Sequence, residues 1–241
     1  MKYPPISCVC PTYGRVHMVE ESIKCFLKQD YKGKKQLVIF NNFPQQQLVF
    51  KHPEIKIVNS TARNLGNARN LSVEAADYDI IANWDDDDIY LPHSLSIRMK
   101  FMKTEFSKFT VGFYYFDGNH YEVTTNIFHG QAIFTKNLYN KISGYSETDV
   151  GEDTDFEQKI PNDLKYVYES KRPYHRLHYV YRWSGSILHI STNSRKKMEM
   201  DVLEKIKKGI EPSGKILLKP KWDRNYIKDV KQAIRKIKTK K

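Results

Sequence analysis

Four consecutive aspartates, Asp85–Asp88, follow the apolar run I-I-A-N-W at 80–84. Two like charges about 6 Å apart repel by about 3 kcal/mol at an effective dielectric constant near 20, so a positive group is expected beside them. In an extended segment, the first and third aspartates share one side and the second and fourth the other. Paired hard oxygen donors suit Mg²⁺ or Mn²⁺. A simpler alternative is that the four acids only cap the helix expected after Pro92.

A second acidic segment, G-E-D-T-D-F, occupies residues 151–156. A carboxylate beside a metal-bound diphosphate can act as the general base for an acceptor hydroxyl. Taken alone, the segment is equally typical of the start of a helix. The spacing of acids in neither segment fits the calcium loop of an EF-hand.

The composition predicts a globular domain: 40% of the 241 residues are hydrophobic and 13% are aromatic. No apolar run reaches the roughly 18 residues that would indicate a membrane span, and the first ten residues lack the apolar core of a signal peptide. Cys8, Cys10 and Cys25 lack C-x-x-C spacing. Cys8 and Cys10 are therefore expected on one buried strand face, in a reducing cytoplasmic protein.

The net charge of +12 is concentrated in the last third of the chain. Residues 201–241 hold 14 Lys and Arg against 5 Asp and Glu, and residues 165–200 hold 8 against 2. Such a block indicates a solvated basic face, or a surface that attracts phosphates, nucleic acid or anionic lipid. Because no zinc-finger spacing or RNA-recognition motif is present, we expect no nucleic-acid partner.

The first hundred residues alternate between strand and helix patterns. This order predicts an α/β fold with a mostly parallel central sheet flanked by helices. Ligands of such sheets bind at the carboxyl ends of the strands, where this chain places Thr12-Tyr13, Asn41-Asn42 and Asp85–Asp88. The expected strands are 5–12, 36–40, 55–58 and 78–84, and the expected helices are 17–29 and 67–76.

The remainder is predicted to add a helix, several short strands and a basic helix at the C-terminal end. Ile227, Val230, Ile234 and Ile237 recur at helical spacing among lysines. This amphipathic helix could dock on anionic lipid, at the inner face of a membrane, or pack against the domain. The expected elements before it are helices at 94–106 and within 151–160, strands at 110–116, 121–125, 131–134, 165–168 and 179–183, and a D-G-N turn at 117–119.

Taken together, five segments resemble the family 2 glycosyltransferases with the GT-A fold, over about residues 5–195. Each segment is a weak signal alone, but all five occur in the family's order. They are I-S-C-V-C-P-T-Y-G-R at 6–15, N-L-G-N-A-R-N at 64–70, N-W-D-D-D-D-I-Y-L-P at 83–92, G-E-D-T-D-F at 151–156 and Y-V-Y-R-W-S-G-S-I-L-H-I-S at 179–191.

The resemblance implies a role for each matching residue. The nucleotide sugar would be bound by Pro11, Thr12, Tyr13, Arg15, Asn41, Asn42, Arg69, Asp85 and Asp86. The metal would be held by Asp87, the most direct ligand, with Asp85 and His189. Asp153 would be the catalytic base, with Glu152 beside it positioning the acceptor, and Tyr181, Arg182 and Trp183 would line the same cleft.

Some positions leave alternatives open. The family usually has an aspartate pair where this chain has Asn41-Asn42, and because an amide donates as well as accepts, the identity of the nucleotide base stays open. His129, in F-H-G-Q-A at 128–132, lies where the family often contacts the acceptor. The alternative for both His129 and His189 is an ordinary core or surface histidine.

The function implied is metal-dependent, inverting transfer of a hexose, with Mn²⁺ or Mg²⁺, from a nucleotide diphosphate sugar to a hydroxyl. A UDP-sugar is favoured, GDP- and dTDP-sugars are open, and the acceptor is a glycan or a lipid-linked or protein-linked group. Residues 1–200 would form one GT-A domain, with a nucleotide-binding half at 1–100 and an acceptor half at 101–200. Residues 201–241 would be a basic helical extension.

Two rival functions remain. A nucleotidyltransferase of related fold also uses metal-binding acids, but it would carry a Gly-rich, basic phosphate loop near the N-terminus. The segment P-T-Y-G-R is poor in both features. The second rival is a non-catalytic basic protein that binds membranes or nucleic acid.

Overall fold

The computed structural model describes residues 3–116, 120–124, 128–168, 177–183 and 213–239. Its central sheet has the strand order β11-β7-β10-β5-β1-β2-β4, in which β10 alone runs antiparallel to its neighbours. The predicted α/β fold with a mostly parallel sheet is therefore confirmed. The strands are β1 Ile6–Thr12, β2 Lys35–Asn41, β4 Ile55–Asn59, β5 Ile80–Asn83, β7 Phe106–Phe109, β10 Ile133–Thr135 and β11 Lys165–Tyr168.

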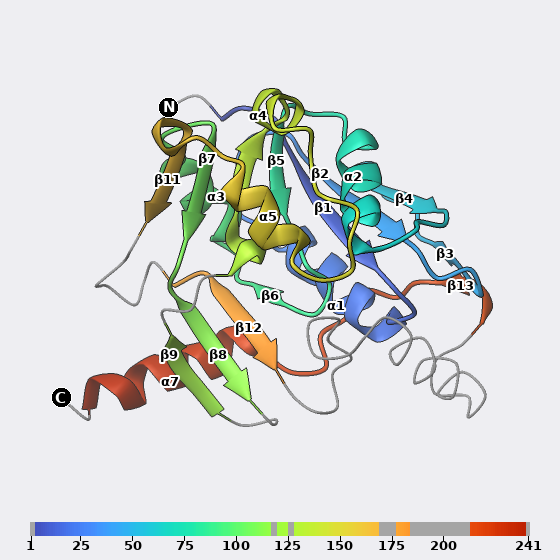
Figure 1. Cartoon of the computed structure of the whole chain (residues 1–241). Helices are drawn as coiled ribbons and strands as arrows, with labels where there is room; N and C mark the ends of the chain where they lie inside the picture. Colours follow the sequence, from blue (N-terminus) through green and yellow to red (C-terminus); the bar gives the residue numbers. More distant parts are fainter. Residues whose placement is uncertain (1–2, 117–119, 125–127, 169–176, 184–212, 240–241) are drawn as a thin grey trace.

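Helices cover both faces of this sheet (Figure 1). Along β1, Cys8 and Cys10 point to the side of α1 and α3, while Val9 points to the side of α2, α4 and α5, as strand alternation requires. The predicted burial of both cysteines on one face is confirmed. The helices are α1 Val16–Leu27, α2 Leu65–Glu74, α3 Ser94–Lys100, α4 Lys136–Lys141 and α5 Glu152–Gln158.

A second sheet, in the order β6-β12-β8-β9, lies below the central one in Figure 1. It contains β6 Ile89–Tyr90, β8 Gly112–Phe116, β9 His120–Thr124 and β12 Tyr179–Trp183. β8 and β9 pair antiparallel, as the expected hairpin requires, and the turn at 117–119 lies outside the described residues. The short β6 follows the four aspartates directly, so this sheet meets the central sheet at the acidic segment.

The C-terminal segment packs on the domain. β13 (Gly214–Leu217) pairs parallel with β3 (Gln46–Val49), and α7 (Tyr226–Thr239) lies against the second sheet (Figure 1). In α7, Tyr226 and Val230 are buried in the main core, and Ile234 packs against it. Of the four residues in the predicted apolar stripe, Val230 and Ile234 therefore pack on the domain and Ile227 is half-buried, while the side chain of Ile237 lies outside the described part.

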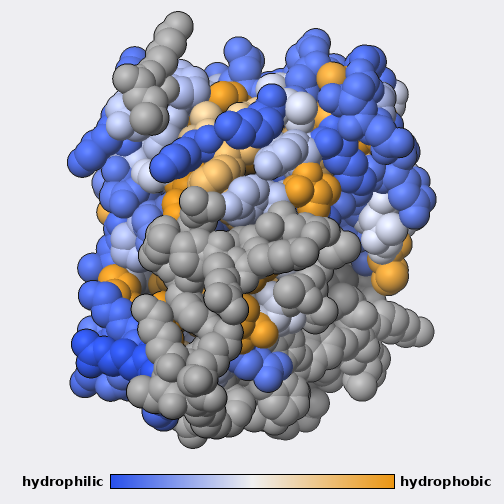
Figure 2. Space-filling view, turned by 90° about the vertical axis from the view of Figure 1, so that its left-hand side faces the viewer, coloured by the Kyte–Doolittle hydropathy of each residue, from blue (hydrophilic) through white to orange (hydrophobic). Residues whose placement is uncertain are grey.

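Among the described residues, no helix combines the length and the apolar composition that a membrane crossing would need. Figure 2 shows one face on which hydrophilic residues cover most of the coloured surface and hydrophobic residues form small patches.

Two expectations about local structure are wrong. The helix expected at 94–106 ends at Lys100, and Phe106–Phe109 is the strand β7, whose buried Lys108 pairs with Glu157 on α5. The four aspartates lie in a turn rather than in an extended segment, closed by a 3.4 Å hydrogen bond from Asp88 N to Asp85 O. Their side chains therefore do not alternate strictly. The short helix α4 and the short strands β3, β6 and β13 were not predicted.

Candidate functional site

An open cleft of about 240 Å³ lies at the carboxyl ends of the central parallel strands. It joins segments from both halves of the chain: the ends of β1 and β5, the helix α2 and the start of α5. Most of the predicted site residues line it. They are Pro11, Thr12, Tyr13, Arg15, Asn42, Arg69, Asp85, Asp86, Asp87, Glu152 and Asp153.

Arg15 supplies positive charge beside the acidic turn. Its guanidinium forms an ion pair with Asp86 and lies 3.1 Å from Oδ2 of Asp87. Asp86 is fully buried and also accepts a 2.6 Å hydrogen bond from the Thr12 hydroxyl. Burial raises the pKa of Asp86 to about 6, while the charge of Arg15 opposes that shift. Because Asp86 and Asp87 face the same arginine, the predicted alternation fails here.

Asp88 anchors the acidic turn to β12. One of its oxygens accepts a hydrogen bond from the Tyr179 hydroxyl, and the other accepts one of 3.2 Å from the backbone N–H of Arg182. Burial, followed by the charge of Asp87, raises the pKa of Asp88 well above its ordinary value. With both oxygens used in this way, Asp88 serves as a structural contact in the wall of the cleft.

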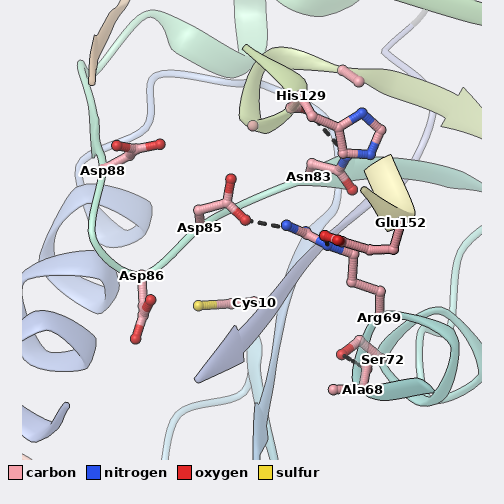
Figure 3. Close-up of polar contacts among 12 residues, drawn as sticks. Cys10, Ala68, Arg69, Ser72, Asn83, Asp85, Asp86, Asp88, His129 and Glu152 are labelled. Atoms are coloured by element: carbon pink, nitrogen blue, oxygen red, sulfur yellow. Dashed lines mark hydrogen bonds and ion pairs between the residues drawn. The ribbon is translucent and has the colours of Figure 1, made fainter. Parts of the chain in front are cut away.

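Asp85 faces the cleft and points at Arg69 (Figure 3). Arg69 places Nη1 3.1 Å from Oδ1 of Asp85 and Nε 3.1 Å from Oε1 of Glu152. Burial lowers the pKa of Arg69, but the carboxylates of Asp85 and Glu152 outweigh it and raise that pKa well above its ordinary value. One guanidinium therefore joins the acidic turn after β5 to the acidic start of α5.

Local packing explains why Arg69 reaches both acids. The side chain of Asn64 caps α2 by accepting a 2.8 Å hydrogen bond from Asn67 N. Gly66, in the first turn of α2, lies so close to the loop before α5 that a Cβ there would be 1.9 Å from Ser146 O. Asp149 in that loop accepts a 3.0 Å hydrogen bond from Leu65 N. The loop is thereby held against α2, next to Arg69.

Asp153 lies on the cleft side of α5 and is half-buried. Its Oδ1 accepts a 2.7 Å hydrogen bond from Thr154 N. Glu152, one residue earlier, is 4% exposed and is held by Arg69. The two acids expected to act together therefore differ: Glu152 is fixed in an ion pair, and Asp153 faces the open cleft.

Two predicted residues, Asn41 and Arg182, are placed differently. Asn41 does not line the cleft, because its amide nitrogen donates to Gln46 O and to Asn59 Oδ1, which ties β2 to β3 and β4. Arg182 lies behind the cleft with its guanidinium buried, whereas Tyr181 lines it as expected. His189 and the side chain of Trp183 lie outside the described residues.

His129 lines the cleft wall and has the contacts of an ordinary buried histidine. Its Nδ1 is 2.8 Å from Glu157 and its Nε2 is 2.9 Å from the Tyr145 hydroxyl. Sequence reasoning did not find two aromatic residues of the cleft, Phe128 and Tyr179. Strand alternation from Tyr181 could have found Tyr179, but the stacking of Phe128 on Tyr181 at 4.6 Å depends on tertiary structure.

The carboxylates of the cleft fit a divalent cation that is shared with a substrate. Within the described residues, no three His, Cys, Asp or Glu side chains cluster as a complete protein cage for a metal. Asp85 and Asp87 nevertheless face the same cleft. Mg²⁺ sites commonly use one or two carboxylates and complete their shell with substrate phosphates and water. The donor set therefore suits a cation bound together with a diphosphate.

A family model and one curated relative match this chain. The sequence profile described as Glycosyl transferase family 2 matches residues 7–154. The UDP-Glc:alpha-D-GlcNAc-diphosphoundecaprenol beta-1,3-glucosyltransferase WfgD of Escherichia coli is 29% identical over an alignment of 143 residues, and the match covers 57% of this chain and 54% of that protein. This chain thus spans about half the length of the curated relative it matches.

Solved structures show the same fold. The TarS 1–349 fragment of S. aureus in complex with UDP-GlcNAc superposes with a TM-score of 0.54, over 95% of this chain and 70% of that one. Its complex with UDP gives a TM-score of 0.53, over 95% and 69%. At 11% identity in both cases, the likeness concerns the fold alone. The expected GT-A fold is confirmed, and the chain belongs to glycosyl transferase family 2.

Proposed function

We propose that this protein is an inverting, divalent-metal-dependent glycosyltransferase that moves a hexose from a nucleotide diphosphate sugar to an acceptor hydroxyl. One observation carries the proposal: Arg69 contacts Asp85 and Glu152 at 3.1 Å each, in a single cleft that Asp87 and Asp153 also line. Asp85 and Asp87, which suit binding of the donor, and Asp153, which suits activation of the acceptor, therefore line the same cleft.

The donor side of the cleft suits a diphosphate. Asp85 and Asp87 would hold Mn²⁺ or Mg²⁺, which when bound offsets the charge that grows on the departing diphosphate. Arg15 and Arg69 add two fixed positive charges at the same edge. Preorganised charges of this kind stabilise a developing anion without reorganisation.

On the acceptor side, Asp153 is proposed as the general base. It accepts the proton of the acceptor hydroxyl while that oxygen forms a bond to the anomeric carbon. The bond from that carbon to the diphosphate oxygen breaks, and the nucleoside diphosphate leaves with the electron pair. Attack from the face opposite the leaving group inverts the anomeric configuration.

The relative from E. coli supports a specific choice of substrates. Its name gives UDP-Glc as donor and a GlcNAc-diphosphoundecaprenol as acceptor. We therefore favour a UDP-sugar and a lipid-linked acceptor for this chain. GDP- and dTDP-sugars remain alternatives for the donor, because Asn42 lines the cleft where the family usually has an acid.

The decisive experiment is product analysis with Mn²⁺, a panel of UDP-, GDP- and dTDP-sugars, and a short-chain lipid diphosphate that carries GlcNAc. We expect acceptor-dependent release of a nucleoside diphosphate, and loss of turnover in Asp87→Ala and Asp153→Asn. Asp153→Asn should still bind the donor. Asp155→Asn is the matched control, because Asp155 lies on the same helix but pairs with Lys159. Release of pyrophosphate instead would support the nucleotidyltransferase.

We also propose that the exposed basic side of α7 contacts the anionic membrane that would hold such an acceptor. Lys228, Lys231 and Lys236 are exposed there. Deleting α7 would remove Tyr226 and Val230 from the core, so charge reversal is the cleaner test. The variant Lys228→Glu/Lys231→Glu should lose co-sedimentation with phosphatidylglycerol vesicles; undiminished binding would reject the membrane contact.

A further inference from the structure

The guanidinium of Arg182 is a meeting point for elements that are far apart in the sequence. Arg182 lies on β12 and is 5% exposed. Its Nε donates to the backbone carbonyl of Asp87, and its Nη1 donates to Glu21 on α1 and, at 3.1 Å, to the Tyr226 hydroxyl on α7. We call Tyr226, Glu21 and Arg182 the support chain.

Glu21 fixes the middle of the support chain. It is 2% exposed, so its carboxylate needs partners inside the protein. One oxygen is paired with Arg182, and the other accepts hydrogen bonds of 2.7 Å from the Tyr226 hydroxyl and 3.2 Å from Asp223 N. Two of these three donors come from the C-terminal segment. The buried charge pair therefore depends on α7 being docked.

The other end of the support chain holds the acidic turn. The Nε of Arg182 donates to the backbone carbonyl of Asp87. The backbone N–H of Arg182 donates a 3.2 Å hydrogen bond to the carboxylate of the adjacent Asp88. The side chain of Asp87 points to the cleft side and pairs with Arg15 at 3.1 Å. A charged donor on a turn carbonyl is a strong, directional contact. It restricts the backbone that carries the Asp87 carboxylate.

We propose that the support chain positions Asp87. Through Tyr226, α7 then contributes to the placement of a carboxylate in the cleft. Tyr226, Glu21 and Arg182 are positioning residues, since none of them lines the cleft. The family profile ends at residue 154, so Arg182 and Tyr226 belong to a part of the chain that it does not cover. The inference rests on the proposed function for the role of Asp87, but the restraint on the turn can be measured without substrate.

The experiment compares hydrogen exchange of the ligand-free protein in two single-hydroxyl variants. Tyr226→Phe removes one hydroxyl from the support chain and keeps the ring in the core. Tyr31→Phe is the matched control, because Tyr31 is 6% exposed and its hydroxyl donates only to Pro4 O among the described contacts. Backbone amides at 85–90 should exchange about fivefold faster in Tyr226→Phe, the ratio expected when one hydrogen bond is lost. They should be unchanged in Tyr31→Phe.

A second variant and a second readout complete the test. Glu21→Gln should loosen residues 85–90 more than Tyr226→Phe does, because it removes the charge that holds Arg182. Calorimetry with UDP and Mn²⁺ should show about fivefold weaker binding in Tyr226→Phe and wild-type binding in Tyr31→Phe. Wild-type exchange at 85–90 in both support-chain variants, or a loosened turn with unchanged UDP–Mn²⁺ affinity, overturns the inference. A loosened turn in a protein that turns over no nucleotide sugar refutes the proposed function and leaves the restraint on the turn intact.

Discussion

Replacing Arg69 by glutamine removes the positive charge between two acids that are mostly shielded from water. The side chains of Arg69 and Glu152 are 9% and 5% exposed, and that of Asp85 is 22% exposed. Removing one partner of a buried ion pair costs about 3–5 kcal/mol. Because Asp85 is partly solvated, we expect the lower end, about 3 kcal/mol. For a domain of this size, that loss lowers Tm by about 6–12 °C.

A double-mutant cycle isolates the contact itself. Arg69→Gln leaves the buried carboxylate of Glu152 without its cation. In the double variant Arg69→Gln/Glu152→Gln that carboxylate is replaced by a neutral amide, so this unpaired charge is no longer present. The double variant should therefore be about 2 kcal/mol more stable than the sum of the two single losses predicts. Arg63→Gln is the control, since Arg63 pairs with Glu147 at the surface with its side chain 73% exposed. Its loss should stay within about 1 kcal/mol.

Urea unfolding at pH 7, followed by tryptophan fluorescence and repeated at high salt, measures all four variants. A shielded bridge should keep most of its coupling at high salt, whereas a surface pair loses it. Additivity of the Arg69 and Glu152 variants within about 0.5 kcal/mol would show that the two side chains do not stabilise each other. The same result would remove the link between the acidic turn and α5 that the proposed reaction uses.

Three other substitutions test separate features. Gly66→Ala should lower the free energy of unfolding by at least about 1–3 kcal/mol in urea, because its Cβ would lie 1.9 Å from the backbone oxygen of Ser146, which cannot rotate away. His178 is fully buried, and burial holds its pKa well below the ordinary value. As the pH falls, the imidazole of His178 therefore stays neutral in the native protein, whereas in the unfolded chain it takes up a proton. Stability should therefore be full above about pH 6.5 and fall below it, and His178→Gln should flatten urea midpoints measured from pH 7 to 5. Gly130→Ala places a methyl group 2.7 Å from Oδ2 of Asp85, so it should reduce sugar transfer more than tenfold with a change in Tm below about 3 °C. Wild-type turnover in that variant would contradict the role of Asp85.

Much of the central sheet could be predicted because its signals are local. The alternation around Cys8 and Cys10 and the helical spacing in α1 lie within short windows, and both match the structure. β7 could not be predicted in this way. Its Lys108 suggests a solvated position, yet it is buried because Glu157, 49 residues later, neutralises it. The pairing of β13 with β3 likewise depends on tertiary contacts.

Most residues of the candidate site could be predicted from the sequence, but the contacts between them could not. The acidic turn and Asp153 were found from residue types, spacing and the resemblance, and they line one cleft. The direction of each aspartate depends on partners elsewhere in the chain, such as Arg15 for Asp86 and Tyr179 for Asp88. Nothing within the run of four identical residues tells which acid receives which partner.

The dependence of Glu21 on residues made much later has a consequence for synthesis. The Tyr226 hydroxyl that completes its contacts is 205 residues further along the chain. At about 5–20 residues per second, a ribosome needs about 10–40 seconds to cover that distance. During this interval α1 cannot bury its carboxylate in the final arrangement, so the nascent protein is most exposed to aggregation and proteolysis until α7 has left the exit tunnel.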